Sequence, residues 1–454
     1  MKILLINPVF EKPQFRLPNI SEPLGLEYLA AMVMPEHDVQ ILDGLPNGLS
    51  YDQIINTIKD FQPDIVGISI IYAFAIKIAK DLSDIIKKYF PDLMILIGGQ
   101  NATFIADDLI KHPSIDIIVS GEGEITFSEL IKKWEVENMK YEVGSGKWEV
   151  RITNIKSQIS TIPGLYYKTP DGQIKNTGKR SAIKDLDTLP LPAHSILKDK
   201  KYYERTIITS RGCGYNCIYC STSSFWGNYR ARSIESIIKE IESLFAPDLF
   251  YATNRIVFVD DTFTIDKNRV KNLCKEFIKL QTKFKFSWGC NARLENITEE
   301  LLITMKDAGC SAIGFGIESG SPKILKLLKR TYTPDDVIKV TRLCKKLGIH
   351  VDAGFIAGLP YETKEDMELT FSLMEKISGL PGLTILTPFH GTPVFNEPDK
   401  YGLTIFPHLP EENDIGKYAW IDNGYLTREE ILAAYKKGLT VCFRKIMKTA
   451  LTEF

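Results

Sequence analysis

The chain has 454 residues, of which 44% are apolar and 25% charged, a balance that is ordinary for a globular protein and excludes a disordered or fibrous one. With 56 basic and 57 acidic residues its net charge is −1, so charge gives no reason to expect a nucleic acid or an anionic membrane as the main partner. A chain of this length exceeds what one hydrophobic core usually organises, and we expect two or three domains.

The N-terminal residues MKILLINPVF form an apolar run that Asn7 and Pro8 interrupt. This run is too short for the core of a signal peptide. The longest apolar stretch, residues 65–76, falls well below the roughly 20 residues that span a bilayer. We therefore expect a cytoplasmic protein without a transmembrane segment.

The first part of the chain alternates short β-rich runs with amphipathic segments, which predicts an α/β domain with a parallel sheet covered by helices on both faces. We expect this doubly wound, Rossmann-like domain to occupy residues 1–140. Ligands of such domains bind beyond the carboxyl ends of the strands. The predicted strands are 2–8, 38–44, 64–70, 94–99 and 115–121, and the predicted helices are 24–34, 51–61, 74–89 and 106–111.

The carboxyl edge of this predicted sheet carries mostly small and polar residues. Gly98, Gly99 and Gly121 have no Cβ, so the backbone there can approach a bulky ligand closely. Tight turns between strand and helix explain the same glycines equally well. The candidate binding residues at this edge are Asn7, Pro8, Ser69, Gly98, Gly99, Gln100, Asn101, Ser120, Gly121 and Glu122.

Residues 141–200 differ from the segments on either side. They contain a short β-rich piece, GLYYKTPDGQIKNTG, in which residues 169–172 form a turn between two strands. We expect a linker that carries a hairpin.

The alternation of strand and helix restarts after Arg205. Six repeats without reversal of order predict a (βα)6 partial TIM barrel over residues 201–390, which gathers its chemistry at the C-terminal ends of its strands. Residues 391–454 form a C-terminal region with a helix from about 428 to 448. The barrel strands are expected at 205–210, 255–261, 284–292, 311–319, 350–358 and 382–388, and its helices at 233–245, 268–280, 298–309, 334–348 and 364–378.

Three cysteines, Cys213, Cys217 and Cys220, stand close together in the loop after the first barrel strand. A structural zinc site needs four ligands, and an electron-transfer iron–sulfur cluster needs four thiolates. The other five cysteines are scattered and form no second pair. A cluster held by this loop would therefore leave one iron without a protein ligand, where a substrate can bind.

The spacing C-x3-C-x2-C, with Tyr219 before the last cysteine, resembles the signature loop of the radical S-adenosylmethionine (SAM) enzymes. The resemblance implies that Cys213, Cys217 and Cys220 bind a [4Fe–4S] cluster whose open iron holds SAM. One electron from the cluster then cleaves SAM to a 5′-deoxyadenosyl radical. An external donor of the flavodoxin or ferredoxin type is the implied partner.

The resemblance also implies contacts between SAM and the ends of the second and third barrel strands. Asp260 and Asp261 close the second strand, where the family places groups near the amino end of SAM, although the family's usual Gly-Gly-Glu is absent. Arg293, at the end of the third strand, meets the SAM carboxylate or bridges to Glu318. Both interpretations of Arg293 stay open.

Further implied SAM contacts come from the cysteine loop and from the fourth and fifth strands. Glu318 and Ser319 reach the ribose or the amino group, and the alternative for Glu318 is a strand-end carboxylate held by backbone N–H groups. Tyr219 lies against the adenine or packs the loop. Gly358 ends the fifth strand and lets the backbone border the adenine.

A doubly wound domain ahead of a radical barrel, with GGQNAT at 98–103 and SGEGE at 120–124, resembles the cobalamin-dependent radical SAM enzymes. The resemblance implies that one chain binds the cluster, SAM and cobalamin, and that the edge residues of the first sheet contact the corrin. The motif Asp-x-His-x-x-Gly is absent, because the first domain has only His37 and His112. The sequence therefore does not identify a lower ligand of the cobalt.

The function that the resemblance implies is a methyltransferase acting on an unactivated carbon of a small molecule, natural product, lipid or pigment. Cyclisation or rearrangement without net methyl transfer, a radical enzyme without cobalamin and a non-catalytic cobalamin sensor are the alternatives. No catalytic acid or base is identified. Tyr332, His350, Asp352 and His390 are candidates that structural roles explain at least as well.

Overall fold

The computed structural model describes residues 1–8, 21–44, 48–71, 73, 75–141, 159–169, 171–197, 202–246, 249, 251–406 and 419–452. The chain divides into two compact units. The first is formed mainly by Met1–Glu204 with Lys239–Ala252, and the second by Arg205–Ile238 and most of the chain after Thr253. None of the described helices has both the length and the apolar content that crossing a bilayer requires.

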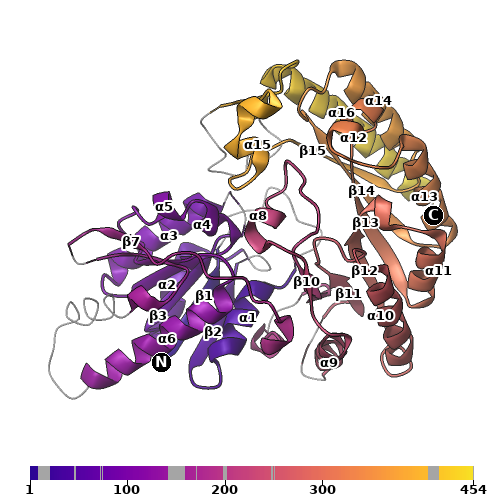
Figure 1. Ribbon diagram of the computed structural model, residues 1–454. Coiled ribbons are helices and arrows are strands. Elements are labelled where there is room, and N and C mark those ends of the chain that lie inside the picture. The colour runs from indigo at the N-terminus through magenta and orange to yellow at the C-terminus, as the bar shows by residue number, and fades with distance from the viewer. Residues whose placement is uncertain are drawn as a thin grey trace. The chain divides into compact units, whose positions relative to one another are not determined.

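The first unit is built on one sheet, in the strand order β2-β1-β3-β4-β5-β6-β7 (Figure 1). Its first five strands are parallel. They confirm the doubly wound fold predicted for this part of the chain. These strands are β1 (Lys2–Asn7), β2 (Asp38–Asp43), β3 (Ile65–Ser69), β4 (Met94–Gly98) and β5 (Ile117–Val119).

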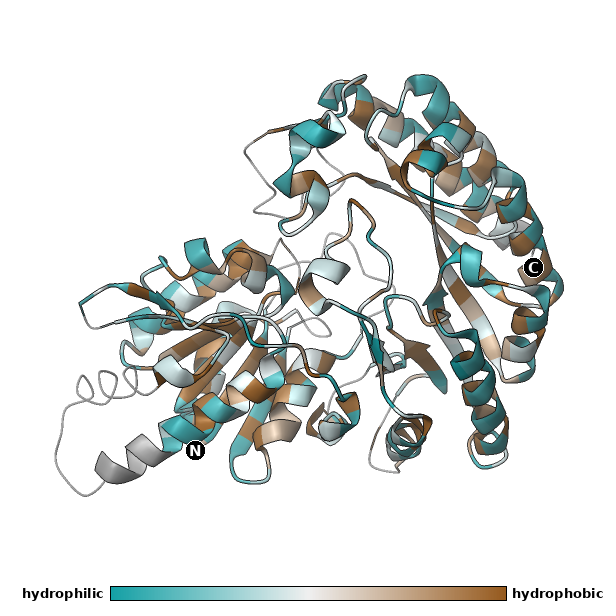
Figure 2. Ribbon diagram, in the orientation of Figure 1, coloured by the Kyte–Doolittle hydropathy of each residue, from teal (hydrophilic) through white to brown (hydrophobic). Residues whose placement is uncertain are grey.

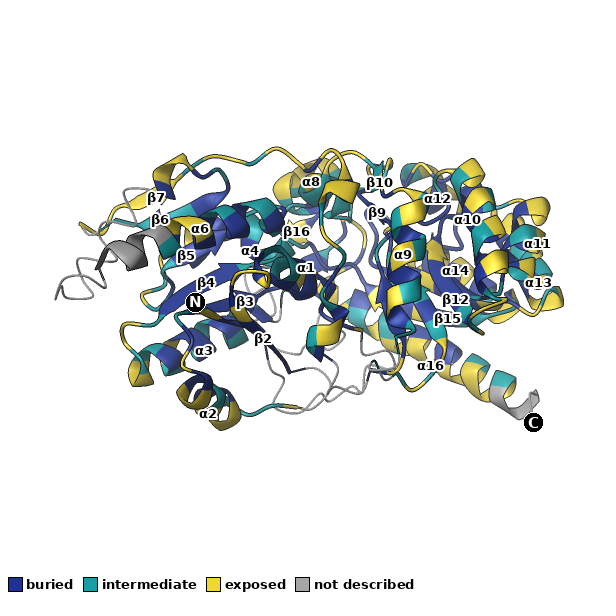
Figure 3. Ribbon diagram, turned by 90° about the horizontal axis from the view of Figure 1, so that it is seen from below, coloured by how far each residue is buried: buried dark blue, intermediate teal, exposed yellow. Residues whose placement is uncertain are grey.

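Helices cover both faces of this sheet, because successive strand residues point to opposite faces and both faces are apolar. Leu5 and Leu96 pack with α1 and α6 on one face, whereas Leu4 and Ile95 pack with α2 and α3 on the other. In Figure 3 the strands are buried and the outer sides of the helices are exposed. The helices are α1 (Leu24–Val33), α2 (Tyr51–Phe61), α3 (Ala75–Tyr89), α4 (Gln100–Phe104), α5 (Ala106–Leu109) and α6 (Gly123–Tyr141).

The predicted hairpin exists as β6 (Leu165–Lys168) and β7 (Ile174–Asn176), but it is not part of a linker. Strand β6 pairs antiparallel with β5, so the hairpin extends the first sheet. Tyr167 is buried in the core of this unit. Burial of alternate hairpin residues against an open sheet edge is the physical reason for the difference.

The second unit contains six parallel strands in the order β15-β14-β13-β12-β11-β8, which follows the chain without reversal. This order confirms the predicted succession of βα repeats. The strands are β8 (Arg205–Ile207), β11 (Arg255–Phe258), β12 (Ser287–Ala292), β13 (Cys310–Glu318), β14 (His350–Ala357) and β15 (Leu380–Ile385).

Helices pack on one face of this second sheet (Figure 1), and their apolar sides turn toward the strands (Figure 2). Thr298 accepts a hydrogen bond from Leu301 N and caps α11, as its position before two glutamates predicts. The helices are α10 (Lys267–Leu280), α11 (Glu299–Asp307), α13 (Pro334–Lys346), α14 (Lys364–Lys376) and α16 (Arg428–Thr452). Helix α9 (Ile234–Leu244) is shared, because its residues from Lys239 on belong to the first unit.

Shorter elements connect these repeats. The pair β9 (Ser210–Arg211) and β10 (Arg230–Ala231) flanks the cysteine loop, and β16 (Thr404–Ile405) pairs with β17 (Ile421–Asp422). The short helices are α8 (Thr222–Trp226), α12 (Pro322–Leu327) and α15 (Pro393–Asn396), and the 3-10 turns are η1 (Ile159–Thr161), η2 (Leu186–Thr188), η3 (His194–Leu197), η4 (Leu294–Asn296) and η5 (Pro398–Tyr401).

Candidate functional site

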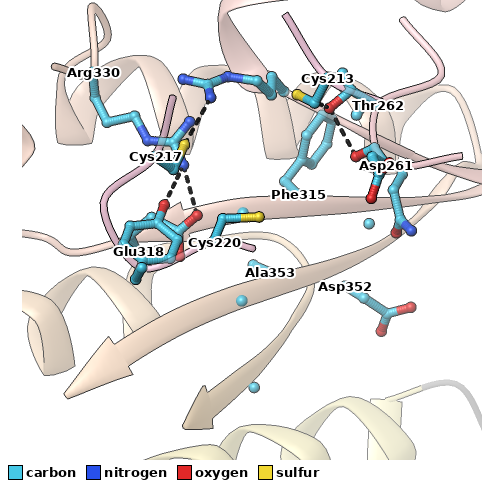
Figure 4. Close-up of a pocket in the computed structure, with 18 of the residues that line it drawn as sticks. Cys213, Cys217, Cys220, Asp261, Thr262, Phe315, Glu318, Arg330, Asp352 and Ala353 are labelled. Atoms are coloured by element: carbon cyan, nitrogen blue, oxygen red, sulfur yellow. Dashed lines mark hydrogen bonds and ion pairs between the residues drawn. The ribbon is translucent and has the colours of Figure 1, made fainter. Parts of the chain in front are cut away.

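A cavity of about 660 Å³ lies against one face of the second sheet (Figure 4), and Ile446 of α16 also reaches its wall. The pleat of β13 puts Gly314, Gly316 and Glu318 on this face and buries Ile313 and Ile317 toward the helices. The volume lies in the range of small-molecule sites. The cavity wall combines the cysteine loop with the last residues of β12 and with residues of β13, β14 and β15.

The cysteine loop leaves β9 through Gly212, which has φ +82°. A Cβ at Gly212 would lie 2.7 Å from the carbonyl oxygen of Asn228, so only glycine fits this turn. The turn brings Cys213, Cys217 and Cys220 to the cavity wall, each of them half-buried.

The arrangement of the three thiols fits a cluster better than one zinc ion. Two sulfur ligands of a tetrahedral zinc lie roughly 3.8 Å apart, because each Zn–S bond is about 2.3 Å. Among the described residues, the groups of three ligand atoms within 4.8 Å of one another do not include these cysteines. The five other cysteines are buried and none lines the cavity. The cavity therefore offers three thiols and no fourth.

Cys213 and Cys217 each contact a polar neighbour from a barrel strand end. The Sγ atom of Cys213 lies 3.5 Å from Thr262 Oγ1. Arg293 donates a hydrogen bond from Nη1 to the Sγ atom of Cys217, over 3.3 Å. Arg293 therefore places a positive charge beside this sulfur.

Arg293 forms an ion pair with Glu295. The ion pair with Glu318, one of the two interpretations that the sequence left open, is not formed. Arg293 Nη2 lies 2.9 Å from Glu295 Oε1, and the guanidinium stacks on the ring of Tyr215 at 3.6 Å from its centroid. Arg293 lines the cavity. Its position beside Cys217 is compatible with a contact to a ligand carboxylate.

Arg330 makes the bridge to Glu318 instead (Figure 4). Its Nη2 lies 2.7 Å from Glu318 Oε1 and also donates to the hydroxyl oxygen of Tyr219 over 2.8 Å. Nε and Nη1 of Arg330 are buried without a hydrogen-bond acceptor among the described residues. Nη1 lies 3.6 Å from Glu295, which is an ion pair without hydrogen-bond geometry. Arg330 thus lines the cavity with two donors not yet used in hydrogen bonds, which fits a residue that binds an anionic group.

Glu318 occupies an unusual backbone position. Its φ is +68°, and the pairing of β13 with β14 shifts register between Gly316 and Glu318. Burial raises the pKa of Glu318, although Arg330 opposes this effect. A left-handed backbone on a non-glycine residue costs free energy and is found mostly at functional sites.

Asp260 and Asp261 are neighbours with different surroundings. Asp260 is fully buried and accepts hydrogen bonds from Thr209 N, Thr209 Oγ1 and Ser210 Oγ, at 2.7–3.0 Å, and from Ser210 N. It does not line the cavity. Asp261 does, and it accepts from Thr222 Oγ1 over 2.9 Å. Asp261 therefore faces the cavity, whereas the carboxylate of Asp260 holds the backbone and side chains of Thr209 and Ser210.

Ser319 and Gly358, two further expected SAM contacts, do not line the cavity. Ser319 is fully buried, with its Oγ atom 3.1 Å from Thr370 Oγ1. Gly358 has φ +82°, and a Cβ there would lie 2.9 Å from a methyl carbon of Ile431 in α16. Close packing against this helix therefore requires a glycine at this position.

Of the four acid or base candidates, Asp352 lines the cavity. His350 Nε2 lies 3.2 Å from its carboxylate. The hydroxyl of Tyr332 donates a hydrogen bond to the carbonyl oxygen of Ile317 over 2.8 Å, so it binds the backbone of β13. The ring of His390 packs on Phe395, with 4.2 Å between centroids.

The polar residues at the carboxyl edge of the first sheet partly bond to one another. Asn7 Nδ2 donates to Asp43 Oδ1 over 2.8 Å, and the Tyr202 hydroxyl donates to Asp43 Oδ2 over 2.6 Å. Asn101 Nδ2 donates to the carbonyl oxygen of Ile71. These amide groups organise the edge itself.

The glycines at this edge differ in role. A Cβ on Gly99, at φ +105°, would lie 2.6 Å from the carbonyl oxygen of Ile70, so close backbone packing requires glycine. Gly121 has φ +80° and open space within 4 Å of the Cβ position. The other expected edge residues occupy the ends of β1, β3, β4 and β5 or the first turn of α4. They are Pro8, Ser69, Gly98, Gln100, Ser120 and Glu122.

Comparisons with known proteins match each unit to a family. Residues 207–374 match the Radical SAM superfamily, and residues 16–131 match the B12 binding domain. The chain is 35% identical over 401 residues to an uncharacterised methyltransferase of Pyrococcus horikoshii, covering 86% of this chain and 82% of the relative.

Two further matches extend the comparison. An anaerobic magnesium-protoporphyrin IX monomethyl ester cyclase of Rubrivivax gelatinosus is 28% identical over 451 residues, covering 96% of this chain and 77% of the relative. The structure of the radical SAM methyltransferase TsrM from Kitasatospora setae, with cobalamin and a [4Fe–4S] cluster bound, aligns with a TM-score of 0.68 at 19% identity. That alignment covers 90% of this chain and 81% of TsrM, and at this identity it shows a shared fold.

Proposed function

Because this chain belongs to the cobalamin-dependent radical SAM enzymes, which use a [4Fe–4S] cluster, SAM and cobalamin, we propose that it methylates an unactivated carbon atom of a small molecule. One observation carries the proposal: a relative that is 35% identical over most of both chains is named a methyltransferase. When bound, these cofactors supply a 5′-deoxyadenosyl radical that removes a hydrogen atom and a methyl group that replaces it.

Cys213, Cys217 and Cys220 are the proposed cluster ligands. Their position at the cavity wall and the absence of a fourth cysteine there support this assignment. Arg293 donates a hydrogen bond to the Sγ atom of Cys217 over 3.3 Å, which places a cation beside this proposed ligand. An external one-electron donor of the flavodoxin or ferredoxin type is the proposed partner.

The residues proposed to bind SAM surround the same cavity. Arg330 offers two buried nitrogens without hydrogen-bond acceptors to the SAM carboxylate, with Arg293 beside it. Glu318 and Asp261 are the proposed acceptors for the amino group or the ribose hydroxyls. Tyr219, held by Arg330, is proposed to flank the adenine.

The carboxyl edge of the first sheet is proposed to bind cobalamin. A corrin ring is broad and flat, so backbone and small side chains suit it better than a charged pocket. The open space at Gly121 supports contact there, and Ser69, Gly98 and Ser120 supply small groups on neighbouring strand ends.

The second candidate function is cyclisation without net methyl transfer. The 28% identity to a cyclase over 96% of this chain favours it. Both reactions begin with the same cofactors, so the cavity residues do not separate them. The fate of the methyl group of SAM does.

The test uses reduced holoenzyme, cobalamin and SAM carrying a labelled methyl group. A methyltransferase moves the label to cobalt, which gives labelled methylcobalamin and S-adenosylhomocysteine before any substrate is known. Cobalamin that stays unmethylated while 5′-deoxyadenosine accumulates contradicts the methyltransferase proposal and supports the cyclase alternative. Once a substrate is found, a product heavier by one methylene group confirms methylation.

A further inference from the structure

A group of buried acidic residues surrounds one histidine in the first unit, outside the residues proposed for the cofactors. His194 begins η3, Glu27 belongs to α1, Glu22 lies just before α1, and Glu240 belongs to α9. Glu27 and Glu240 are 0% exposed, His194 3% and Glu22 5%. Buried charges cost free energy unless they are paired or bind a metal.

The distances in this group suit ligands of one metal ion. The Nδ1 atom of His194 lies 2.7 Å from Glu27 Oε2 and 3.9 Å from Glu22 Oε1. One ligand atom from each of these three residues lies within 4.8 Å of the other two. Ligand atoms about 2.1 Å from a metal are separated by roughly 3.0–3.4 Å in octahedral or tetrahedral geometry. The two distances from Nδ1, 2.7 and 3.9 Å, lie just below and just above that range.

The second nitrogen of His194 is held in the manner of a metal ligand. Its Nε2 lies 3.2 Å from Glu240 Oε1. With the proton on Nε2, this carboxylate accepts it, and Nδ1 keeps a free lone pair on the side of the ring where Glu27 and Glu22 lie. A carboxylate bonded to the far nitrogen is the usual device that orients a metal-binding histidine. The hydroxyl of Tyr251 donates to Glu22 and fixes that carboxylate.

A plain ion pair between His194 and Glu27 explains the geometry less well. Although Nδ1 and Oε2 are 2.7 Å apart, neither Nδ1 nor either oxygen of Glu27 makes a hydrogen bond within the described part of the chain. The side chains approach without the alignment that an N–H donor requires. A metal ion beside both atoms accounts for this contact.

We propose that Glu22, Glu27 and His194 bind one divalent metal ion, with Glu240 orienting the histidine. Two carboxylates and one imidazole are donors that Mn²⁺ and Fe²⁺ accept. The ion would tie α1 to η3 and, through Glu240, to α9. Its role is structural, and the proposal does not depend on methyl transfer.

The experiment titrates Mn²⁺ into the full-length protein and follows free Mn²⁺ by electron paramagnetic resonance. Mn²⁺ is chosen because the thiolates of the cysteine loop are soft ligands that bind it weakly. Wild type should bind one Mn²⁺ per chain, and Glu27→Gln should weaken binding at least about tenfold. Glu135→Gln is the matched control, because Glu36, His37 and Glu135 form the other histidine–glutamate group of this kind among the described residues.

Thermal unfolding supplies a second readout. Mn²⁺ should raise the melting temperature of wild type and of Glu135→Gln but not that of Glu27→Gln or His194→Gln. Without metal, Glu27→Gln should melt no lower than wild type, because the substitution removes a buried negative charge. If Glu27→Gln does not fold, the same comparison of melting temperatures with and without Mn²⁺ is made on His194→Gln.

Two outcomes overturn the proposal. One is Mn²⁺ binding that survives Glu27→Gln or that is lost in Glu135→Gln. The other is a wild-type melting temperature that Mn²⁺ leaves unchanged while Glu27→Gln melts lower without metal. That second result would identify the group as an ion pair between His194 and Glu27.

Discussion

The carboxyl edges of the two sheets present different surfaces. In the second unit, Glu318, Arg293 and Arg330 reach a cavity wall beside the three cysteines. In the first unit, Asn7 and Asn101 bond to neighbouring residues of the same unit. We therefore propose that charged side chains select the ligand at the second edge, whereas shape and backbone select it at the first. Substitutions at the second edge should cause large losses, because they remove charges or metal ligands. Substitutions at the first edge should cause small losses, because they only add bulk.

The largest effect is expected at Cys217. Replacing it with Ala removes one of three proposed thiolate ligands, so the cluster should be lost and formation of 5′-deoxyadenosine abolished, while cobalamin binding is mostly spared. Chromatography of 5′-deoxyadenosine and titration with hydroxocobalamin measure the two properties. Cys442→Ala, on α16 and outside the cavity wall, is the control and should keep full activity. Retained cleavage of SAM in Cys217→Ala would refute the ligand assignment.

The next effect is expected at Arg330. Arg330→Met removes the proposed donors to SAM and leaves Glu318 as a buried charge without this partner. We expect a loss of about 100-fold in 5′-deoxyadenosine formation and a destabilisation of about 3 kcal/mol. Thermal unfolding measures the second effect.

The double variant Glu318→Gln with Arg330→Met tests whether the loss of activity follows from the loss of stability. It removes both charges, so stability should return while activity stays low. Recovery of activity together with stability would mean that neither side chain is needed to bind SAM.

A pH-dependent effect is expected at Glu362, which is fully buried beside the exit of β14 and accepts hydrogen bonds from Gly358 N and Leu359 N. Burial raises the pKa of Glu362 to about 8, above the value of an unfolded chain. The native state therefore keeps a proton that the unfolded state loses. Its contribution to stability is complete below about pH 4.5 and is lost as the pH rises to about 8.

Glu362→Gln should remove this pH dependence. The stability of wild type relative to the variant should fall by a few kcal/mol between pH 5 and pH 9, as measured by urea unfolding at both values. A difference between the two proteins that is the same at pH 5 and pH 9 would show that Glu362 is ionised in the folded protein.

The smallest effect is expected at the edge of the first sheet. Gly121→Ala puts a methyl group into the open space proposed to face the corrin, and we expect about tenfold weaker binding of hydroxocobalamin. Gly172→Ala is a close control, because Gly172 has φ +81°, near the +80° of Gly121, and open space as well. Equal affinities of the two variants for hydroxocobalamin would mean that cobalamin does not contact Gly121.

The sequence predicted the strand order of the second sheet and the cavity residues that belong to a motif. Cys213, Cys217, Cys220 and Tyr219 share one loop, and a loop after a strand end reaches the cavity by topology alone. Asp260 and Asp261 show where prediction from the sequence ends. Which of two adjacent residues faces a cavity depends on how the strand ends, and the sequence does not contain that information in readable form.

The residues that sequence reasoning missed act over long range. Arg330 lies between two helices, and its ion pair with Glu318 depends on how that segment folds back onto β13. A Cβ on Gly358 would meet Ile431, a neighbour far along the chain that the sequence around Gly358 does not reveal. The small residues Gly314 and Gly316 follow the alternation of β13, which was a usable signal.

The most direct test of the account is the electron paramagnetic resonance spectrum of the reduced cluster with and without SAM. If three cysteines leave one iron open, adding SAM changes the g-values of the wild-type cluster, because its amino and carboxylate groups bind that iron. A reduced cluster whose spectrum is identical in the presence of saturating SAM would contradict the account.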